Sequence, residues 1–167
     1  MIVVIEGPDN AGKTTLAMYL AKQLRAVYVK VERPQRAVDL MAYQNILEVA
    51  DDYSGWVISD RHVAISEPIY GTILRGGYDL RPEDITRCYT RIGAIVHCRP
   101  PTPAVLSTVG DRPQMEGVIE NSDRIIEAYD ELFESIHLGQ ELLVKSYDFT
   151  KDSRDDLIDW LKQYRYH

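Results

Sequence analysis

The most chemically distinctive residues of the chain lie near its start, in the segment GPDNAGKT (7–14). This segment matches the phosphate-loop pattern G-x-x-x-x-G-K-[ST]. In such a loop, backbone N–H groups point inward and bind anionic oxygens, and the following helix adds the partial positive charge of its N-terminus. The lysine would reach the terminal phosphates and the threonine hydroxyl would bind Mg²⁺. The sequence therefore predicts a site for ATP and Mg²⁺ formed by Gly7, Asn10, Ala11, Gly12, Lys13, Thr14 and Thr15.

A phosphate loop needs a strand before it and a helix after it, and the sequence supplies both. Strand-like runs at 2–6, 26–31, 55–60, 93–99 and 141–147 alternate with helical patterns at 13–25, 36–50, 64–75, 82–92, 117–136 and 153–164. A short helix is expected after the PPTP segment at 100–103. Strands that alternate with helices favour a parallel sheet covered on both faces. We therefore predict an α/β P-loop NTPase fold with a five-stranded parallel sheet, in one domain over 1–167.

Charged side chains follow three of these strands, at the sheet edge where the phosphate loop also lies. The segment ERP (32–34) follows the second strand, DRH (60–62) comes at the end of the third, and Arg99 ends the fourth. Ligands of parallel sheets bind beyond the carboxyl ends of the strands, and a guanidinium group suits phosphate oxygens. We therefore expect Arg33 and Arg61 to hold a second phosphate, whereas Arg99 fits a solvated surface residue.

Two other residues of the third strand end could take part in the chemistry. Asp60 is expected to organise Mg²⁺ together with Thr14, and it could also cap the next helix. His62 fits a packing residue or a base contact better than a general base. A phosphate oxygen is already a competent nucleophile at neutral pH, so positioning and electrostatics would carry the rate.

Composition excludes several other classes of protein. The chain has 167 residues, 45% of them hydrophobic, and a formal net charge of −7. A large nucleic-acid surface would need an excess of Lys and Arg, so we expect no nucleic-acid partner. No apolar run has membrane length, and the first strand leaves no room for a signal peptide. Cys88 and Cys98 lack C-x-x-C spacing and fit reduced residues of an intracellular, cytoplasmic protein.

Two segments together resemble the thymidylate kinase family of nucleoside monophosphate kinases: IEGPDNAGKTT (5–15) and ISDRHVAISEPIYG (58–71). The family has an acid in its phosphate loop, a D-R-[YH] motif after the third strand, and then a serine and a tyrosine four residues apart. The segment at 110–133 resembles the lid and the helix that follows it, which places a lid at about 107–118. The chain departs from the pattern in being shorter between the second and third strands, and in having Gly71 where the family often has glutamine.

The resemblance implies transfer of the ATP γ-phosphate to a deoxynucleoside monophosphate, dTMP or a modified dUMP. Asp9 would accept a hydrogen bond from the sugar 3′-hydroxyl, which also explains an acid inside an anion-binding loop. Arg112, the only arginine between Thr102 and Asn121, would reach from the lid to the transferring group beside Lys13 and Arg61. Substrate contacts are expected from Asp9, Arg33, Tyr43, Gln44, Asn45, Arg61, Ser66 and Tyr70.

Other functions stay open at this point. A GTP-binding switch would need N-K-x-D, which the chain lacks. A deoxynucleoside kinase would need a carboxylate near the 5′-hydroxyl, and Glu32 could serve. A catalytically weak nucleotide-binding protein would merely keep the fold. Members of the resembled family usually form homodimers through helices beside the third strand; the stripe Ile65, Ile69, Ile73 and Leu74 fits such a contact, but core packing is the favoured interpretation.

Overall fold

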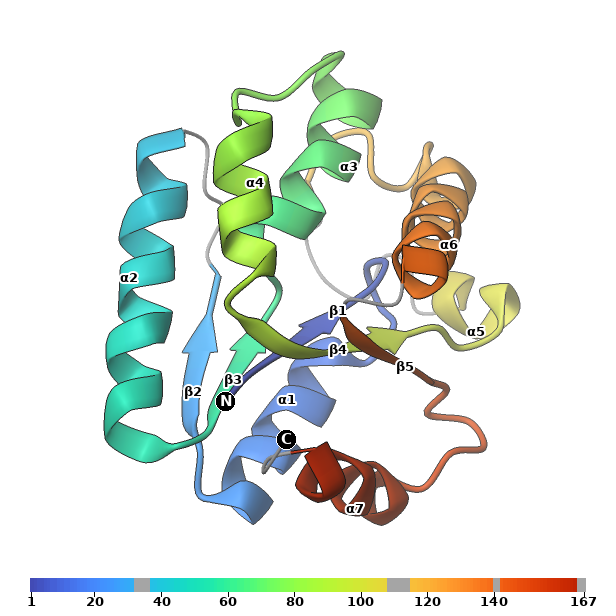
Figure 1. Cartoon of the computed structure of the whole chain (residues 1–167). Helices are drawn as coiled ribbons and strands as arrows, with labels where there is room; N and C mark the ends of the chain where they lie inside the picture. Colours follow the sequence, from blue (N-terminus) through green and yellow to red (C-terminus); the bar gives the residue numbers. More distant parts are fainter. Residues whose placement is uncertain (32–36, 108–114, 140–141, 165–167) are drawn as a thin grey trace.

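The computed structural model describes residues 1–31, 37–107, 115–139 and 142–164 (Figure 1). Three residues expected at the site, Glu32, Arg33 and Arg112, lie outside these ranges, as does most of the segment expected to form the lid. Predictions about them therefore stay predictions.

Five parallel strands form one sheet: β1 (Ile2–Glu6), β2 (Val27–Lys30), β3 (Val57–Asp60), β4 (Ile92–Cys98) and β5 (Leu143–Tyr147). Their order in the sheet is β2-β3-β1-β4-β5, so the first strand of the chain is the central one. Each strand lies within two residues of its predicted bounds, and the predicted five-stranded parallel sheet is confirmed. The order places the carboxyl ends of β3 and β4 on either side of the phosphate loop.

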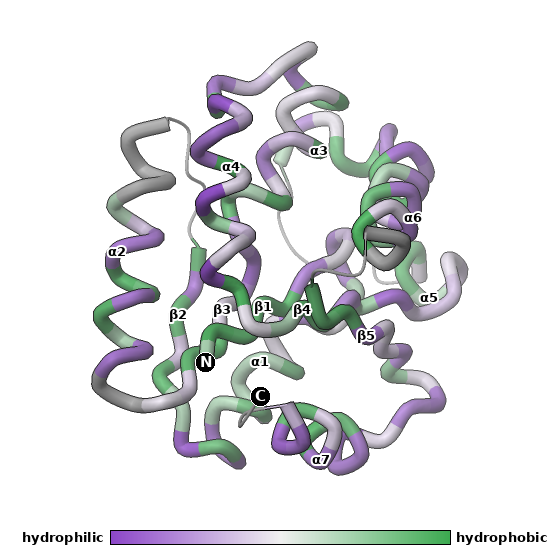
Figure 2. The backbone as a smooth tube through the Cα atoms, viewed as in Figure 1, coloured by the Kyte–Doolittle hydropathy of each residue, from purple (hydrophilic) through white to green (hydrophobic). Residues whose placement is uncertain are grey.

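Helices cover both faces of this sheet (Figure 1). They are α1 (Lys13–Leu24), α2 (Ala37–Ser54), α3 (Val63–Arg75), α4 (Pro82–Tyr89), α5 (Thr102–Leu106), α6 (Ser122–Gly139) and α7 (Arg154–Tyr164). On one face, α1 and α7 pack together, and the other face carries α2, α3, α4 and α6. In Figure 2 the strands are mostly hydrophobic, whereas hydrophilic and hydrophobic stretches alternate along the helices.

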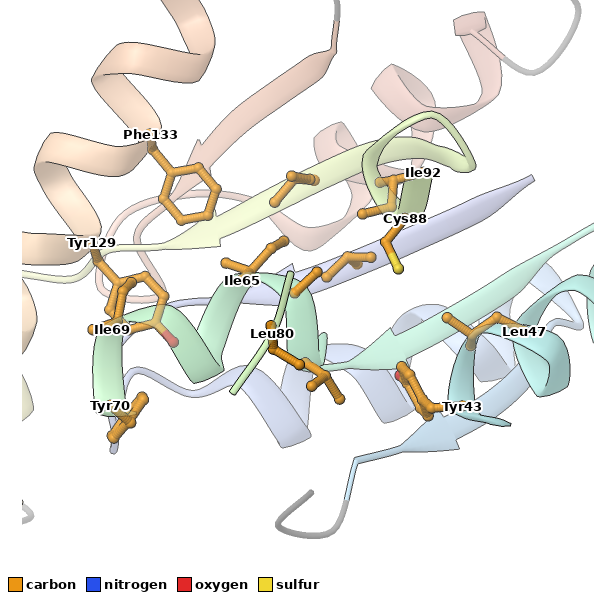
Figure 3. Close-up of a cluster of buried hydrophobic side chains, with 14 of the residues drawn as sticks. Tyr43, Leu47, Ile65, Ile69, Tyr70, Leu80, Cys88, Ile92, Tyr129 and Phe133 are labelled. Carbon is orange, nitrogen blue, oxygen red and sulfur yellow. The ribbon is translucent and has the colours of Figure 1, made fainter. Parts of the chain in front are cut away.

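The alternation of side chains along the strands divides the core into two clusters. In β1, Ile2 and Val4 point into the cluster under α2, α3, α4 and α6, and Val3 and Ile5 point into the cluster under α1 and α7. Figure 3 shows the first cluster, with side chains from α6 at one end and from α2 at the other. Because β1 is buried on both faces, its first four residues form a continuous apolar run.

Several helix boundaries differ from those expected: α2 continues to Ser54 and α6 to Gly139, and two other differences have local reasons. The helix expected to begin at 117 begins at Ser122, because a turn precedes it in which Gly117 has a φ of 81°. The helix expected over 82–92 ends at Tyr89, because β4 already starts at Ile92.

The apolar stripe on α3 belongs to the core. Ile65 and Ile69 are buried in the first cluster, and Ile73 and Leu74 pack against it. Core packing, the favoured interpretation, is therefore confirmed for this stripe. Cys88 and Cys98 are buried free thiols. Within the described ranges, no helix is both long and apolar enough to cross a lipid bilayer.

Candidate active site

The phosphate loop connects the end of β1 to the first turn of α1 in a conformation that requires its glycines. Gly7 has a φ of 141° and Gly12 a φ of 78°, both in the region that favours glycine. A Cβ atom on Gly7 would also collide with the carbonyl oxygen of Cys98 in β4. The loop therefore passes so close to the neighbouring strand that only glycine fits, which leaves the N-terminus of α1 open to an anion.

Lys13 is folded back into this loop. Its side chain is buried, and its Nζ donates to the carbonyl oxygen of Pro8. Burial, together with the nearby charge of Arg61, lowers the pKa of Lys13 to about 8 against the opposing effect of Asp9 and Glu6. A desolvated ammonium group held in place in this way is preorganised to bind a phosphate oxygen.

Thr14 and Asp60 come together as the magnesium prediction requires. The Thr14 hydroxyl donates to Oδ2 of Asp60 at 2.7 Å, and the Tyr28 hydroxyl donates to the same oxygen at 2.9 Å. Hydroxyl and carboxylate oxygens are ligands that Mg²⁺ accepts, with phosphates and water in its remaining positions. The pair fits that role; in the described part of the chain, no group of three or more His, Cys, Asp or Glu side chains is arranged as a metal site.

Arg61 lies beside the phosphate loop and points toward it. Its Nη2 donates to Oδ1 of Asp9 at 2.6 Å and to the Tyr70 hydroxyl at 3.3 Å. Its Nη1 donates to the Tyr129 hydroxyl at 3.2 Å and to the Gly7 carbonyl at 3.4 Å. The guanidinium group also lies 5.1 Å from the centre of the Tyr70 ring. These four hydrogen bonds fix the orientation of the guanidinium group before any ligand binds.

Asp9 has partners that its sequence position did not suggest. Oδ1 accepts from Arg61, and Oδ2 accepts from the Tyr70 hydroxyl at 2.8 Å. Burial acts to raise the pKa of Asp9, but the charges of Arg61 and Lys13 and the bond from Tyr70 lower it overall. The carboxylate therefore stays ionised at neutral pH. Its ion pair with Arg61 already explains an acid in this loop, so a sugar contact stays a prediction.

Glu6 is a site residue that sequence reasoning missed. Its side chain is completely buried at the end of β1. Oε1 accepts from the His62 backbone N–H at 2.6 Å, and Oε2 accepts from Tyr129 at 2.9 Å and from the Gly7 N–H at 3.2 Å. Burial raises the pKa of Glu6, partly offset by the charge of Arg61. The available signal was an acid that directly follows four apolar residues of a buried strand.

Three of the residues expected to contact the substrate, Tyr43, Gln44 and Ser66, lie around His62 and are engaged with the protein. Gln44 is completely buried; its Oε1 lies 3.2 Å from Nε2 of His62 and its Nε2 donates to Glu48 at 3.1 Å. The Tyr43 hydroxyl donates to the Arg61 carbonyl at 3.1 Å, and the Ser66 hydroxyl to the His62 carbonyl at 3.0 Å. Asn45 is exposed.

His62 acts here as a structural residue. It caps α3, since its Nδ1 accepts from the Ala64 N–H at 3.1 Å. Burial lowers the pKa of His62 to about 4, so the ring is neutral at physiological pH. This arrangement agrees with the expectation of a packing residue rather than a general base.

Arg99 does not join the cluster around Arg61. It forms a two-pronged ion pair with Asp130 of α6, in which Nε lies 2.7 Å from Oδ1 and Nη2 lies 2.9 Å from Oδ2. The arginine at the end of β4 therefore ties α6 to the sheet.

Sequence comparisons find kinases of nucleotides. A cytidylate kinase of Pediococcus pentosaceus is 31% identical over 98 residues, which cover 55% of this chain and 43% of that protein. A cytidylate kinase of Clostridium botulinum is 39% identical over 49 residues, or 29% of this chain and 23% of that protein. The chain thus matches less than half the length of these curated relatives. No protein-family model matches the chain.

Structure comparisons agree on the fold. The YorR protein of Bacillus subtilis, solved in complex with phosphorylated GDP, has a TM-score of 0.75 and 22% identity, with 100% of this chain and 99% of that chain covered. A deoxyadenosine kinase of M. mycoides, solved with dCMP and dCDP, has a TM-score of 0.64 and 18% identity, with 98% and 97% covered. The fold is therefore that of the P-loop kinases. The comparisons point to kinases of nucleosides and nucleotides in general and do not favour thymidylate kinases.

Proposed function

We propose that this chain transfers the γ-phosphate of ATP to a pyrimidine nucleoside monophosphate, with a deoxynucleotide as the preferred acceptor. One observation carries the proposal: the phosphate loop with Lys13 lies directly beside an oriented arginine, Arg61, that is bound to the loop acid Asp9. A donor phosphate site and a second cationic site thus share one sheet edge. The pyrimidine is suggested by two sources, the cytidylate kinases among the relatives and the resemblance to thymidylate kinases.

The residues would divide the work as follows. Backbone N–H groups of the loop and the Lys13 ammonium bind the β- and γ-phosphates of ATP. Thr14 and Asp60 would hold Mg²⁺, which neutralises charge on the transferring group when it is bound. Arg61, joined by Arg33, would hold the acceptor phosphate in line, and Arg112 would reach the transferring group from the segment expected to form the lid. No proton needs to be removed from a phosphate oxygen at neutral pH, which agrees with the absence of a charged histidine at position 62.

A panel of acceptors tests this proposal. Release of ADP is measured with ATP, Mg²⁺ and either dCMP, CMP, dTMP, dUMP, dGMP, dAMP or the matching nucleosides. We expect kcat/KM for the best pyrimidine monophosphate to exceed that for its nucleoside by at least about a hundredfold, the value of one lost charge-assisted phosphate contact. A preference for nucleosides would make the chain a nucleoside kinase with Glu32 as its base. If ADP is released no faster with any acceptor than by hydrolysis of ATP alone, the chain is a nucleotide-binding protein without kinase activity.

Asp9 is expected to read the sugar 3′-hydroxyl of the acceptor. If the 3′-hydroxyl of the acceptor nucleotide donates to Asp9, it shares the carboxylate with Tyr70, since each carboxylate oxygen can accept two hydrogen bonds. The 3′-deoxy analogue should lose about 1–3 kcal/mol of transition-state binding, or roughly 5- to 150-fold in kcat/KM. Asp9→Asn should lower activity on the normal acceptor nucleotide. It should also reduce the ratio of kcat/KM for that nucleotide to kcat/KM for its 3′-deoxy analogue. Equal kcat/KM values for the two acceptors in the wild type would remove Asp9 from the sugar site.

The titration of Lys13 should make ATP binding depend on pH. With a pKa of about 8 the free protein loses the ammonium charge above that pH, so affinity for ATP should fall by up to about tenfold per pH unit between pH 8 and 10. Stability should change in the opposite direction. The pKa is lower in the folded than in the unfolded chain, so the unfolded chain binds more protons between about pH 8 and 10.5, and the free energy of unfolding rises with pH there.

Lys13→Arg is the matched control for this titration, because a guanidinium group keeps its charge over the whole range. Calorimetric titration with ATP at pH 7, 8, 9 and 9.5 measures the effect. The same slope in the wild type and in Lys13→Arg would assign the pH dependence to another group.

A further inference from the structure

The Glu6 carboxylate connects three separate parts of the chain. Its hydrogen bonds come from the turn after β3 (His62 N–H), from the phosphate loop (Gly7 N–H) and from α6 (Tyr129 hydroxyl). Its Oε2 also lies 3.9 Å from Nη1 of Arg61, so the two residues form an ion pair. A completely buried carboxylate is costly unless it is paired and hydrogen-bonded, and all of its partners here surround Arg61.

The backbone at Arg61 needs this support. Its φ of 76° lies in the left-handed region, which a long side chain adopts only when the surroundings hold it there. The Arg61 N–H donates to the Ile5 carbonyl at 3.0 Å, and the next N–H, that of His62, donates to Glu6. The Arg61 carbonyl accepts from Tyr43 and from Ser59 at 2.5 Å. The turn that aims the guanidinium group is therefore fixed from both sides.

Tyr129 fixes the other end of the side chain. Its hydroxyl donates to Oε2 of Glu6 at 2.9 Å and accepts from Nη1 of Arg61 at 3.2 Å. The residue is completely buried, and its ring stacks beside those of Phe133 and His97, with centres 6.1 and 6.2 Å away. A phenyl ring would satisfy that packing equally well. The hydroxyl group is required only for the polar contacts with Glu6 and Arg61.

We propose that Glu6 and Tyr129 are positioning residues: together they hold Arg61 in the one orientation in which it can receive the acceptor phosphate. The proposal rests on the function proposed above. It adds that the orientation of Arg61 depends on a residue of α6. Tyr129 acts through Arg61 and touches no reacting atom. Its hydroxyl is the contact by which α6 reaches the guanidinium group.

Tyr129→Phe tests the proposal, with Tyr147→Phe as the matched control. Tyr147 is also a buried tyrosine but lies in the cluster on the opposite face of the sheet. For the best acceptor of the panel, we expect Tyr129→Phe to lower kcat/KM by about tenfold, the value of one hydrogen bond to a charged group, with KM for ATP within about twofold of the wild type. The control should leave both parameters within about twofold.

A second measurement needs no substrate. In the wild type, the Nη1–H group of Arg61, which donates to Tyr129 and to Gly7, should give a side-chain NMR signal that exchanges slowly with solvent, assigned by its loss in Arg61→Lys. Tyr129→Phe should broaden or shift this signal, and Glu6→Gln should do so more strongly because it alters both the turn and the tyrosine bridge. The control should leave it in place.

The outcomes separate the two proposals. An unchanged Arg61 signal in Tyr129→Phe together with unchanged acceptor kcat/KM would overturn the positioning role. A changed signal in a protein whose wild type phosphorylates no nucleotide would overturn the proposed function and leave the positioning role standing. A rise in KM for ATP as large as the loss of acceptor kcat/KM would also overturn the inference, because it would show a general disturbance of the site.

Discussion

Lys13→Ala is expected to lower kcat by about a hundred- to a thousandfold, the usual cost of removing one preorganised stabiliser of transition-state charge. The reason lies in the position of the ammonium group, which is buried inside the phosphate loop and held by the Pro8 carbonyl. No other described lysine is buried, so no neighbour in that part of the chain can replace it.

The measurement is ADP release at saturating ATP and acceptor, with circular dichroism to verify the fold. Because burial makes the charge of Lys13 costly in the folded state, the free energy of unfolding should stay the same or rise in Lys13→Ala. A loss of activity without a loss of stability would identify a catalytic rather than a structural role. A variant that keeps more than about a tenth of wild-type turnover would contradict this role.

Arg61→Ala is expected to have two large effects at once. Removing the guanidinium group deprives the buried Glu6 and the partly buried Asp9 of their main cationic partner, which should lower the free energy of unfolding by about 3–5 kcal/mol. It should also weaken binding of the acceptor monophosphate by about 2–5 kcal/mol, the cost of truncating a desolvated charge pair. ATP binding should change much less, because Lys13 and the loop N–H groups remain.

Arg99→Ala is the matched control, since Arg99 also ends a strand at this sheet edge but pairs with the half-exposed Asp130. That ion pair is open to solvent, so its loss should cost at most about 1 kcal/mol of stability and leave acceptor binding unchanged. Each nucleotide is titrated separately at a temperature where all variants are folded. If Arg61→Ala weakened ATP and acceptor binding equally, Arg61 would not belong to the acceptor site.

The fold and the phosphate loop could be predicted from the sequence because their signals are local. The apolar run at 2–5, the two glycines and the lysine at 13 each carry a specific backbone or charge requirement, and the alternation of strands with helices determines the layers. The start of α6 was missed because the helical pattern continues through Gly117, where the backbone turns instead.

The network around Arg61 could not be predicted in the same way. The pattern D-R-H assigns an arginine to a phosphate, but it says nothing of Glu6 and Tyr129, which reach Arg61 from positions far away in the sequence. Gln44 shows the same limit. Its polar side chain was expected to contact the substrate, whereas the packing of α2 turns it toward His62. Helical periodicity shows which residues lie outside the apolar stripe of a helix. It does not show whether a buried polar side chain contacts a ligand or another side chain.

The central position of β1 has a consequence for the order in which the protein is made. Ile2 pairs with Val57 on one side and with Ile92 on the other, so β1 has both neighbours only after β3 and β4, which follow it in the chain, have been synthesised. Pairings so distant in sequence slow folding and leave apolar strands exposed meanwhile. On the ribosome, the phosphate loop would therefore be translated before β4 but closed against Cys98 only after β4 has emerged. Nascent chains that end before β4 should be unable to retain ATP and should depend on chaperones that shield apolar segments.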